Sequence, residues 1–229
     1  MRIWSSSSTN VFTVTPATLR ESTGSLGCWV PRGGPIEGFA LPHSESVTIS
    51  DFFTMEHADG TIYRPTVAYC YLPSDGALAS LHEVRMNNWS LPDNYRVVTN
   101  EIVSGADELG VLVLGPQRTG WWYGSRLDIL QTRALLQETN PTALQVAAGV
   151  YSASKWILEN GNLGYRESED LPYQTILEYA RPYLGTVIRT GTTWNPLKDR
   201  RPLYDDAFVD RASVWQFNNF LVHSGFRGR

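Results

Sequence analysis

A histidine and a glutamate stand two positions apart, at His43 and Glu45, where the sequence predicts the start of a helix. A carboxylate and an imidazole brought to one place can form an acid/base pair. The same residues also have a purely structural explanation. Ser44 would cap the helix, and Glu45 would lie in its first turn because the helix macrodipole favours a negative charge there. The spacing alone leaves both interpretations open.

Two further groups of ionisable residues are weaker indications of a site. His82 and Glu83 are neighbours in a predicted helix. Adjacent helical residues point about 100° apart, so at most one of them faces a pocket and the other is solvated. Glu101 precedes Asp107 and Glu108 in an acidic cluster beside a predicted strand. Acidic surface loops are common, so this cluster says little by itself.

Three consecutive aromatic residues occur in the segment Gly120-Trp121-Trp122-Tyr123-Gly124-Ser125. In a strand they must present two faces, so not all of them can belong to the core. A ring beside carboxylates suits an aliphatic diammonium ion. The carboxylates neutralise the ammonium groups, while the ring holds the cation and the methylenes. An edge strand packed under a partner subunit explains the same residues equally well.

The elements that must position these residues form strands first and helices later. β-Branched and aromatic runs predict strands at 61–63, 66–71, 95–98, 101–103, 110–115 and 121–123. Periodicity and capping residues predict helices at 75–87, 141–160 and 172–181. This order predicts an α+β fold, with a mixed, largely antiparallel sheet and helices packed on one face. Residues 1–23 are Ser/Thr-rich and predict a poorly structured stub before one domain at 24–229.

Composition excludes several classes of function. The chain has 229 residues, a net charge of −4 and only 18% charged residues, so no basic field would attract nucleic acid. Its two cysteines fit a reducing cytoplasm, and its four histidines have no zinc-site spacing. No apolar run reaches the ~18 residues that cross a bilayer. We therefore expect a cytoplasmic protein without a metal, a nucleic-acid partner or a membrane partner.

Glycine patterns that bind phosphates are absent from the sequence. No G-x-G-x-x-G follows a predicted strand, and the nearest spacing, Gly161-x-x-Gly164, lies beyond the end of a helix. The G-x-x-x-x-G-K-[ST] pattern is also missing. The sequence thus predicts no Rossmann domain and no dinucleotide cradle in this chain.

Ten segments in register give the chain a resemblance to bacterial homospermidine synthases, in the saccharopine-dehydrogenase-like group. The resemblance covers residues 24–222 and corresponds to the C-terminal half of the family. It is carried by 38–53, 63–71, 79–83, 101–103, 107–112, 122–125, 142–146, 182–185, 193–197 and 215–217.

The resemblance implies an NAD-dependent transferase of polyamine metabolism. Such enzymes oxidise putrescine to an imine, release ammonia, condense the product with a second diamine and return the hydride. The family binds NAD in an N-terminal Rossmann domain, so this chain would require a separate NAD-binding half. The family is dimeric, which implies a homodimer. An aliphatic diamine or polyamine is the implied ligand.

The resemblance and the residue types together indicate six site residues. Glu45, His82 and Glu101 are the predicted catalytic residues, with His82 as a proton shuttle. Trp29, Glu37 and Trp122 are predicted to line the substrate pocket.

Two positions depart from the family pattern. Ser44 replaces an amide, and Glu37 replaces an aromatic residue that would offer a ring face. These departures leave the choice of substrate open. The missing glycine-rich loop favours a second reading for the isolated chain, a non-catalytic polyamine-binding or dimerisation module.

Overall fold

A computed structural model describes residues 2–5, 25–94, 98, 100–115, 119–198 and 209–222, and for residues 2–5 it describes the backbone only. Two predictions fall partly outside these ranges. Residues 95–97 of the predicted strand at 95–98 are not described, nor are residues 1 and 6–23 of the predicted stub.

One eight-stranded sheet organises the described residues, with the order β10-β2-β3-β6-β1-β7-β8-β9. Strands β1 and β7 run parallel, and the other neighbours pair antiparallel. The bounds are β1 Arg2–Ser5, β2 Ser25–Val30, β3 Gly34–Leu41, β6 Thr66–Tyr71, β7 Ala106–Leu114, β8 Gly120–Asp128, β9 Thr186–Thr192 and β10 Leu221–Val222. A separate two-stranded sheet pairs β4, Met55–Glu56, with β5, Ile62–Tyr63.

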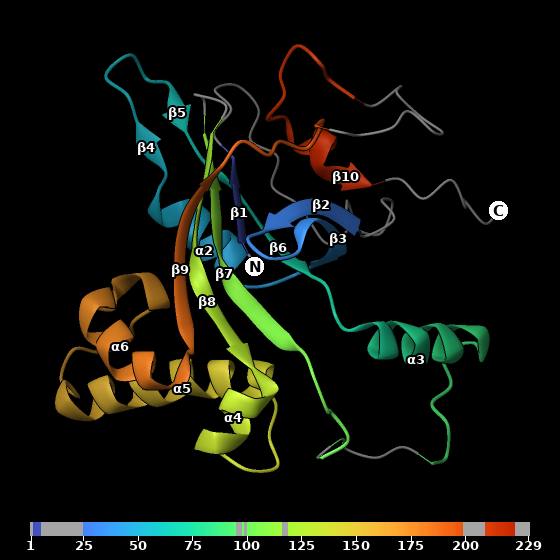
Figure 1. The fold of residues 1–229 in the computed structure, drawn as a ribbon. Coiled ribbons are helices and arrows are strands. Elements are labelled where there is room, and N and C mark those ends of the chain that lie inside the picture. The colour runs from blue at the N-terminus through green and yellow to red at the C-terminus, as the bar shows by residue number, and fades with distance from the viewer. Residues whose placement is uncertain are drawn as a thin grey trace.

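The helices differ in how they meet the sheet. Helices α4 (Ile129–Leu135), α5 (Pro141–Glu159) and α6 (Tyr173–Ala180) gather at one end of β7, β8 and β9 (Figure 1). Helix α2 (Glu45–Phe52) packs against β6. Helix α3 (Asp75–Met86) stands away from the body in Figure 1 and has no buried residue. Three short 3₁₀ helices complete the set: η1 Ser168–Asp170, η2 Arg181–Tyr183 and η3 Phe217–Phe220.

Local sequence accounts for several helix boundaries. The Asn140 side chain accepts a hydrogen bond from the Ala143 amide at 2.9 Å, and Pro141 occupies the first turn of α5. Ser74 caps α3 in the same way, accepting from the Ala77 amide at 3.4 Å. Ser44 does not behave as expected, because it precedes α2 without a capping hydrogen bond from its side chain.

The α+β class and the largely antiparallel sheet are confirmed. Residues 101–103, predicted as a strand, have no regular structure, so that prediction was wrong. Segment 110–115 was expected to be covered on both faces. It lies in β7, where Leu112 and Leu114 are buried while Val113 is exposed. Residues 2–5, inside the predicted stub, form β1 between β6 and β7. Strands β2, β3 and β9 were not predicted.

The core lies on one face of the sheet. It brings together Leu26, Cys28, Val30, Ala68, Cys70, Leu112, Leu114, Trp122, Trp194, Trp215 and Phe220. Burial raises the pKa of the Cys28 thiol, and both cysteines are free of disulfides. None of the helices in the described ranges is both long and apolar enough to traverse a lipid bilayer.

Candidate functional site

His43 and Glu45 meet where β3 ends and α2 begins. The His43 Nδ1 atom lies 2.6 Å from a carboxylate oxygen of Glu45. The His43 ring stacks on Tyr69 of β6, with centroids 4.9 Å apart and planes 13° apart. The imidazole is thus held by the Glu45 carboxylate on one side and a ring face on the other. Such orientation is what a proton-transfer group needs.

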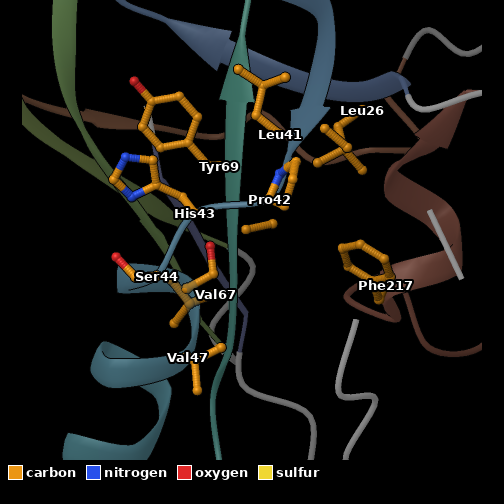
Figure 2. Close-up of a pocket in the computed structure, with 12 residues that line it drawn as sticks. Leu26, Leu41, Pro42, His43, Ser44, Val47, Val67, Tyr69 and Phe217 are labelled. Atoms are coloured by element: carbon orange, nitrogen blue, oxygen red, sulfur yellow. The ribbon is translucent and has the colours of Figure 1, made fainter. Parts of the chain in front are cut away.

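A cavity of about 300 Å³ opens beside this pair. In Figure 2, His43 and Tyr69 lie on one side of β6 while Phe217 of η3 lies on the other. The wall is mostly aliphatic or aromatic, and its polar contribution comes from residues at the start of α2. The lining consists of Leu26, Ala40, Leu41, Pro42, His43, Ser44, Ser46, Val47, Val67, Ala68, Tyr69 and Phe217.

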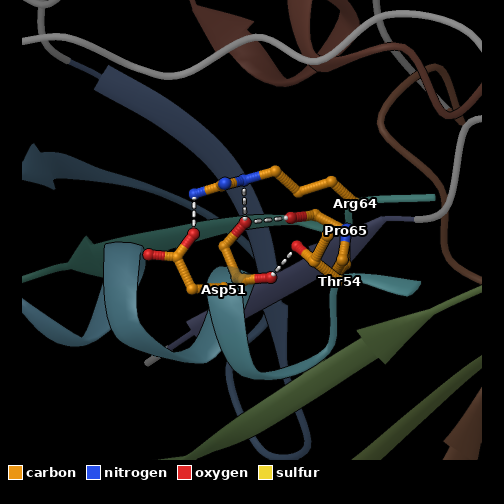
Figure 3. Close-up of polar contacts among 5 residues, drawn as sticks. Asp51, Thr54, Arg64 and Pro65 are labelled. Atoms are coloured by element: carbon orange, nitrogen blue, oxygen red, sulfur yellow. Dashed lines mark hydrogen bonds and ion pairs between the residues drawn. The ribbon is translucent and has the colours of Figure 1, made fainter. Parts of the chain in front are cut away.

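A polar network fixes the far end of α2 (Figure 3). The buried Ser50 hydroxyl donates to the Pro65 carbonyl at 2.7 Å and accepts from Arg64 Nε at 3.0 Å. Arg64 also pairs with Asp51, and the Thr54 hydroxyl donates to the Ser50 carbonyl at 2.8 Å. These contacts join α2 to the segment that leads into β6. The helix that carries Glu45 is therefore held against the strand that carries Tyr69.

A second carboxylate lies against α2, and sequence reasoning did not identify it. Glu169 of η1 accepts a hydrogen bond from the Thr48 hydroxyl at 3.0 Å. Thr48 is three residues after Glu45, so the two positions share one side of the helix. The sequence offered no signal for this approach, because η1 follows α5 far along the chain.

The three predicted pocket residues do not line this cavity. Trp122 is completely buried in the core, and its neighbour Trp121 points outward. Trp29 of β2 packs against the same core. Glu37 is exposed on β3, opposite Gly27 of β2. Their proposed roles in substrate binding remain predictions, but they would require surfaces other than this cavity.

The predicted catalytic residues also lie apart. Glu45 is at the site and holds His43 of the lining. His82 is exposed on α3, the helix that stands away from the body. Glu101 is exposed in the segment before β7. The structure therefore brings His43 and Tyr69 to Glu45, where the prediction had expected His82 and Glu101.

The arrangement can bind an elongated apolar molecule with a cationic or proton-exchanging end. The wall buries methylene groups, and Glu45 supplies negative charge through its contact with His43. With Nδ1 engaged by Glu45, Nε2 is the ring nitrogen that can give or take a proton. Among the described residues, no group of three or more His, Cys, Asp or Glu side chains is placed to hold a metal ion.

Comparison with known proteins gives a consistent relationship. The chain is 41% identical to the homospermidine synthase of Blastochloris viridis and 39% identical to that of Mesorhizobium japonicum, over 85% of its own length in each case. The chain resembles part of homospermidine synthase. The solved homospermidine synthase of Legionella pneumophila, in complex with NAD, matches 87% of the chain with a TM-score of 0.81 and 39% identity. No model of a known protein family matches.

The chain spans about two fifths of the homospermidine synthases that it matches, namely 41% and 40% of the two relatives and 43% of the solved chain. The helices of the described residues do not begin with a turn that could hold NAD. A dinucleotide cradle needs glycines in the turn between a strand and a helix. The three residues before each of α2, α3, α4, α5 and α6 contain no glycine.

Proposed function

We propose that this chain is the substrate-handling part of a homospermidine synthase-like enzyme, which transfers an aminobutyl group between putrescine molecules with the help of NAD. The observation that carries the proposal is the His43–Glu45 pair beside an apolar cavity. About 40% identity to homospermidine synthases supports the proposal.

The residues of the site have separate tasks in this proposal. The aliphatic wall takes the methylenes of the diamine, and Glu45 attracts one ammonium group. The paired His43 accepts a proton from the amine, since a neutral amine is the form that can react at a carbon centre. Tyr69 fixes the plane of the imidazole. Glu169 offers negative charge for the second ammonium group on the same side of α2.

NAD and the redox step belong to a separate NAD-binding half in this proposal. The helix starts of the described residues support this division, because they lack glycine turns. The two buried thiols favour a reducing compartment such as the cytoplasm.

We also propose a homodimer. The outer face of α5 carries the exposed residues Val146, Val150 and Ile157, at helical spacing along one stripe. Trp121 adds a large exposed ring on β8. Trp122, which the sequence suggested for the same surface, cannot contribute because it is buried.

A non-catalytic polyamine-binding or dimerisation module remains a second candidate. The glycine-free helix starts favour it for the chain acting alone. Both candidates bind the same ligand, but only the first takes part in converting it.

Calorimetric titration with putrescine tests the ligand. We expect weak binding by the wild type and loss of binding in Glu45→Gln, which keeps the shape and removes the charge. The side chains of His43 and Glu45 are 44% and 25% exposed, so the loss should lie between about 1 kcal/mol, the value for an exposed pair, and about 3–5 kcal/mol, the value for a desolvated pair. Glu83→Gln, which replaces an exposed carboxylate on α3, is the control. An unchanged constant in Glu45→Gln would exclude Glu45 from the site.

A further inference from the structure

The chain projects a small hairpin arm, residues 52–63, from the end of α2 (Figure 1). The arm consists of Phe52, Phe53 and the two-stranded sheet β4–β5, which is separate from the main sheet. An isolated two-stranded hairpin is marginally stable in water. This arm therefore needs either strong local bonds or a covering partner.

The arm is built to hold its shape. At its base, Arg64 and Ser50 tie α2 to the segment after β5 (Figure 3). At its tip, Asp59 Oδ1 accepts hydrogen bonds from the amide of Thr61 at 2.9 Å and from its hydroxyl at 2.6 Å, and these bonds lower the pKa of Asp59. Gly60 has a φ of +79°, which favours glycine in this turn. A preorganised arm loses little conformational entropy on binding.

Both faces of the arm expose large apolar side chains. Phe52 and Met55 are each 56% exposed, and Ile62 is 62% exposed. Met55 pairs with Tyr63, while Ile62 pairs with Glu56, so Met55 and Ile62 point to opposite faces of the hairpin. A flat partner would cover only one face. Apolar groups on both faces suit insertion into a groove.

The position of the arm indicates which partner provides the groove. Helix α2 has eight residues, so the arm begins roughly 12 Å from the Glu45 end of the helix. A body that grips the arm thus lies about one length of α2 from the His43–Glu45 site. The matched homospermidine synthases contain more than twice the length that this chain spans, and the additional part must approach the substrate to deliver NAD chemistry.

We infer that residues 52–63 insert into a groove of the NAD-binding half of a homospermidine synthase-like enzyme, an inference that rests on the proposed function. Glu56 and Asp59 place negative charge beside the apolar residues of the arm, so the rim of the groove is basic.

The test uses the purified chain and, as probe, the NAD-binding part of the Blastochloris viridis homospermidine synthase, used only after its NAD binding has been verified. Binding is measured by interferometry, with wild type, Met55→Ser and Ile62→Ser. Leu130→Ser on α4 and Met86→Ser on α3 are controls, because these residues are 72% and 71% exposed. All four substitutions replace exposed side chains, so each variant is expected to keep the melting temperature of the wild type.

We expect the wild type to bind and the controls to bind as the wild type does. Each arm variant should bind at least about tenfold more weakly. Hydrogen exchange should show protection of residues 52–63 in the complex. No binding by the wild type would overturn the inference. Loss of binding in a control but not in the arm variants would also overturn it, since another surface would then hold the partner. Putrescine titration of the chain alone is independent of these outcomes and judges the proposed function separately.

Discussion

The Nδ1 atom of His43 lies 2.6 Å from the Glu45 carboxylate, and the ring of His43 stacks on Tyr69. This relationship shows that the two residues meet, which their spacing alone left open. Ser44 forms no side-chain cap, and Glu45 engages the neighbouring imidazole. The contact makes His43, rather than His82, the histidine to test first.

We expect His43→Asn to weaken putrescine binding by about tenfold or more, because Glu45 loses the partner that orients its carboxylate. His82→Asn should bind as the wild type does, since His82 is exposed on the detached helix α3. Calorimetric titration of both variants measures the difference. Equal losses of putrescine affinity in the two variants would indicate that His82 also belongs to the site.

Ser50 is predicted to support the site without touching the ligand. Ser50 is buried, and its hydroxyl donates to the Pro65 carbonyl and accepts from Arg64. Ser50→Ala removes both hydrogen bonds. Leaving buried polar groups unpaired costs about 1–3 kcal/mol. We expect that loss in urea denaturation, with weaker putrescine binding. Thr54→Val removes the hydroxyl that donates to the Ser50 carbonyl. This variant should lose less stability, about 0.5–1.5 kcal/mol. A Ser50→Ala variant as stable as the wild type would contradict this role of the network.

Sequence reasoning succeeded where local signals set the structure. Asn140 and Pro141 marked the start of α5, and the run before Gly115 marked β7. It failed for β2 and β3, where glycines interrupt the strand pattern. Gly38 is required there by tertiary contact, because a Cβ would lie 2.8 Å from Cys70 Sγ and 2.9 Å from the Tyr71 carbonyl. No neighbour in sequence reveals that need.

The candidate site was predictable only in part. Glu45 was identified from its spacing to His43. Tyr69 and Glu169 reach α2 through the pairing of β3 with β6 and through the path of η1, which are tertiary relationships. Trp122 was assigned to the pocket because three aromatics cannot all be buried, yet the pleat turned Trp121 outward and Trp122 inward. The register of the strand decides which of the two rings is buried, and composition does not show that register.

Trp122 should matter for stability far more than Trp121. Trp122 is completely buried, so Trp122→Ala should lower the free energy of unfolding by about 3–5 kcal/mol. Its indole nitrogen has no hydrogen-bond partner within the described structure, so Trp122→Phe should be milder. Trp121→Ala should cost about 1 kcal/mol or less. Urea denaturation followed by circular dichroism checks the order. A Trp121 loss equal to that of Trp122 would contradict the burial.

The chain alone is expected to bind NAD weakly or not at all. The starts of helices α2 to α6 offer no glycine turn that would admit a pyrophosphate close to the backbone. Calorimetric titration with NAD measures this. Micromolar or tighter affinity would show that the chain has a dinucleotide site of its own, and the separate NAD-binding half would become unnecessary.

The last prediction is a homodimer through the outer face of α5. Val146, Val150 and Ile157 are 57%, 64% and 53% exposed along one stripe of the helix, an arrangement that water disfavours and a second copy would cover. Light scattering should give twice the chain mass of 25.7 kDa. Val150→Glu places a charge in the centre of the stripe, where an unpaired buried carboxylate is costly, so it should shift the protein to the monomer. Met86→Glu on α3 is the control and should remain dimeric. A wild type that stays at the mass of a single chain at every concentration would exclude the dimer. A dimer lost only in Met86→Glu would place the interface on α3, where Leu81 and Met86 are also exposed.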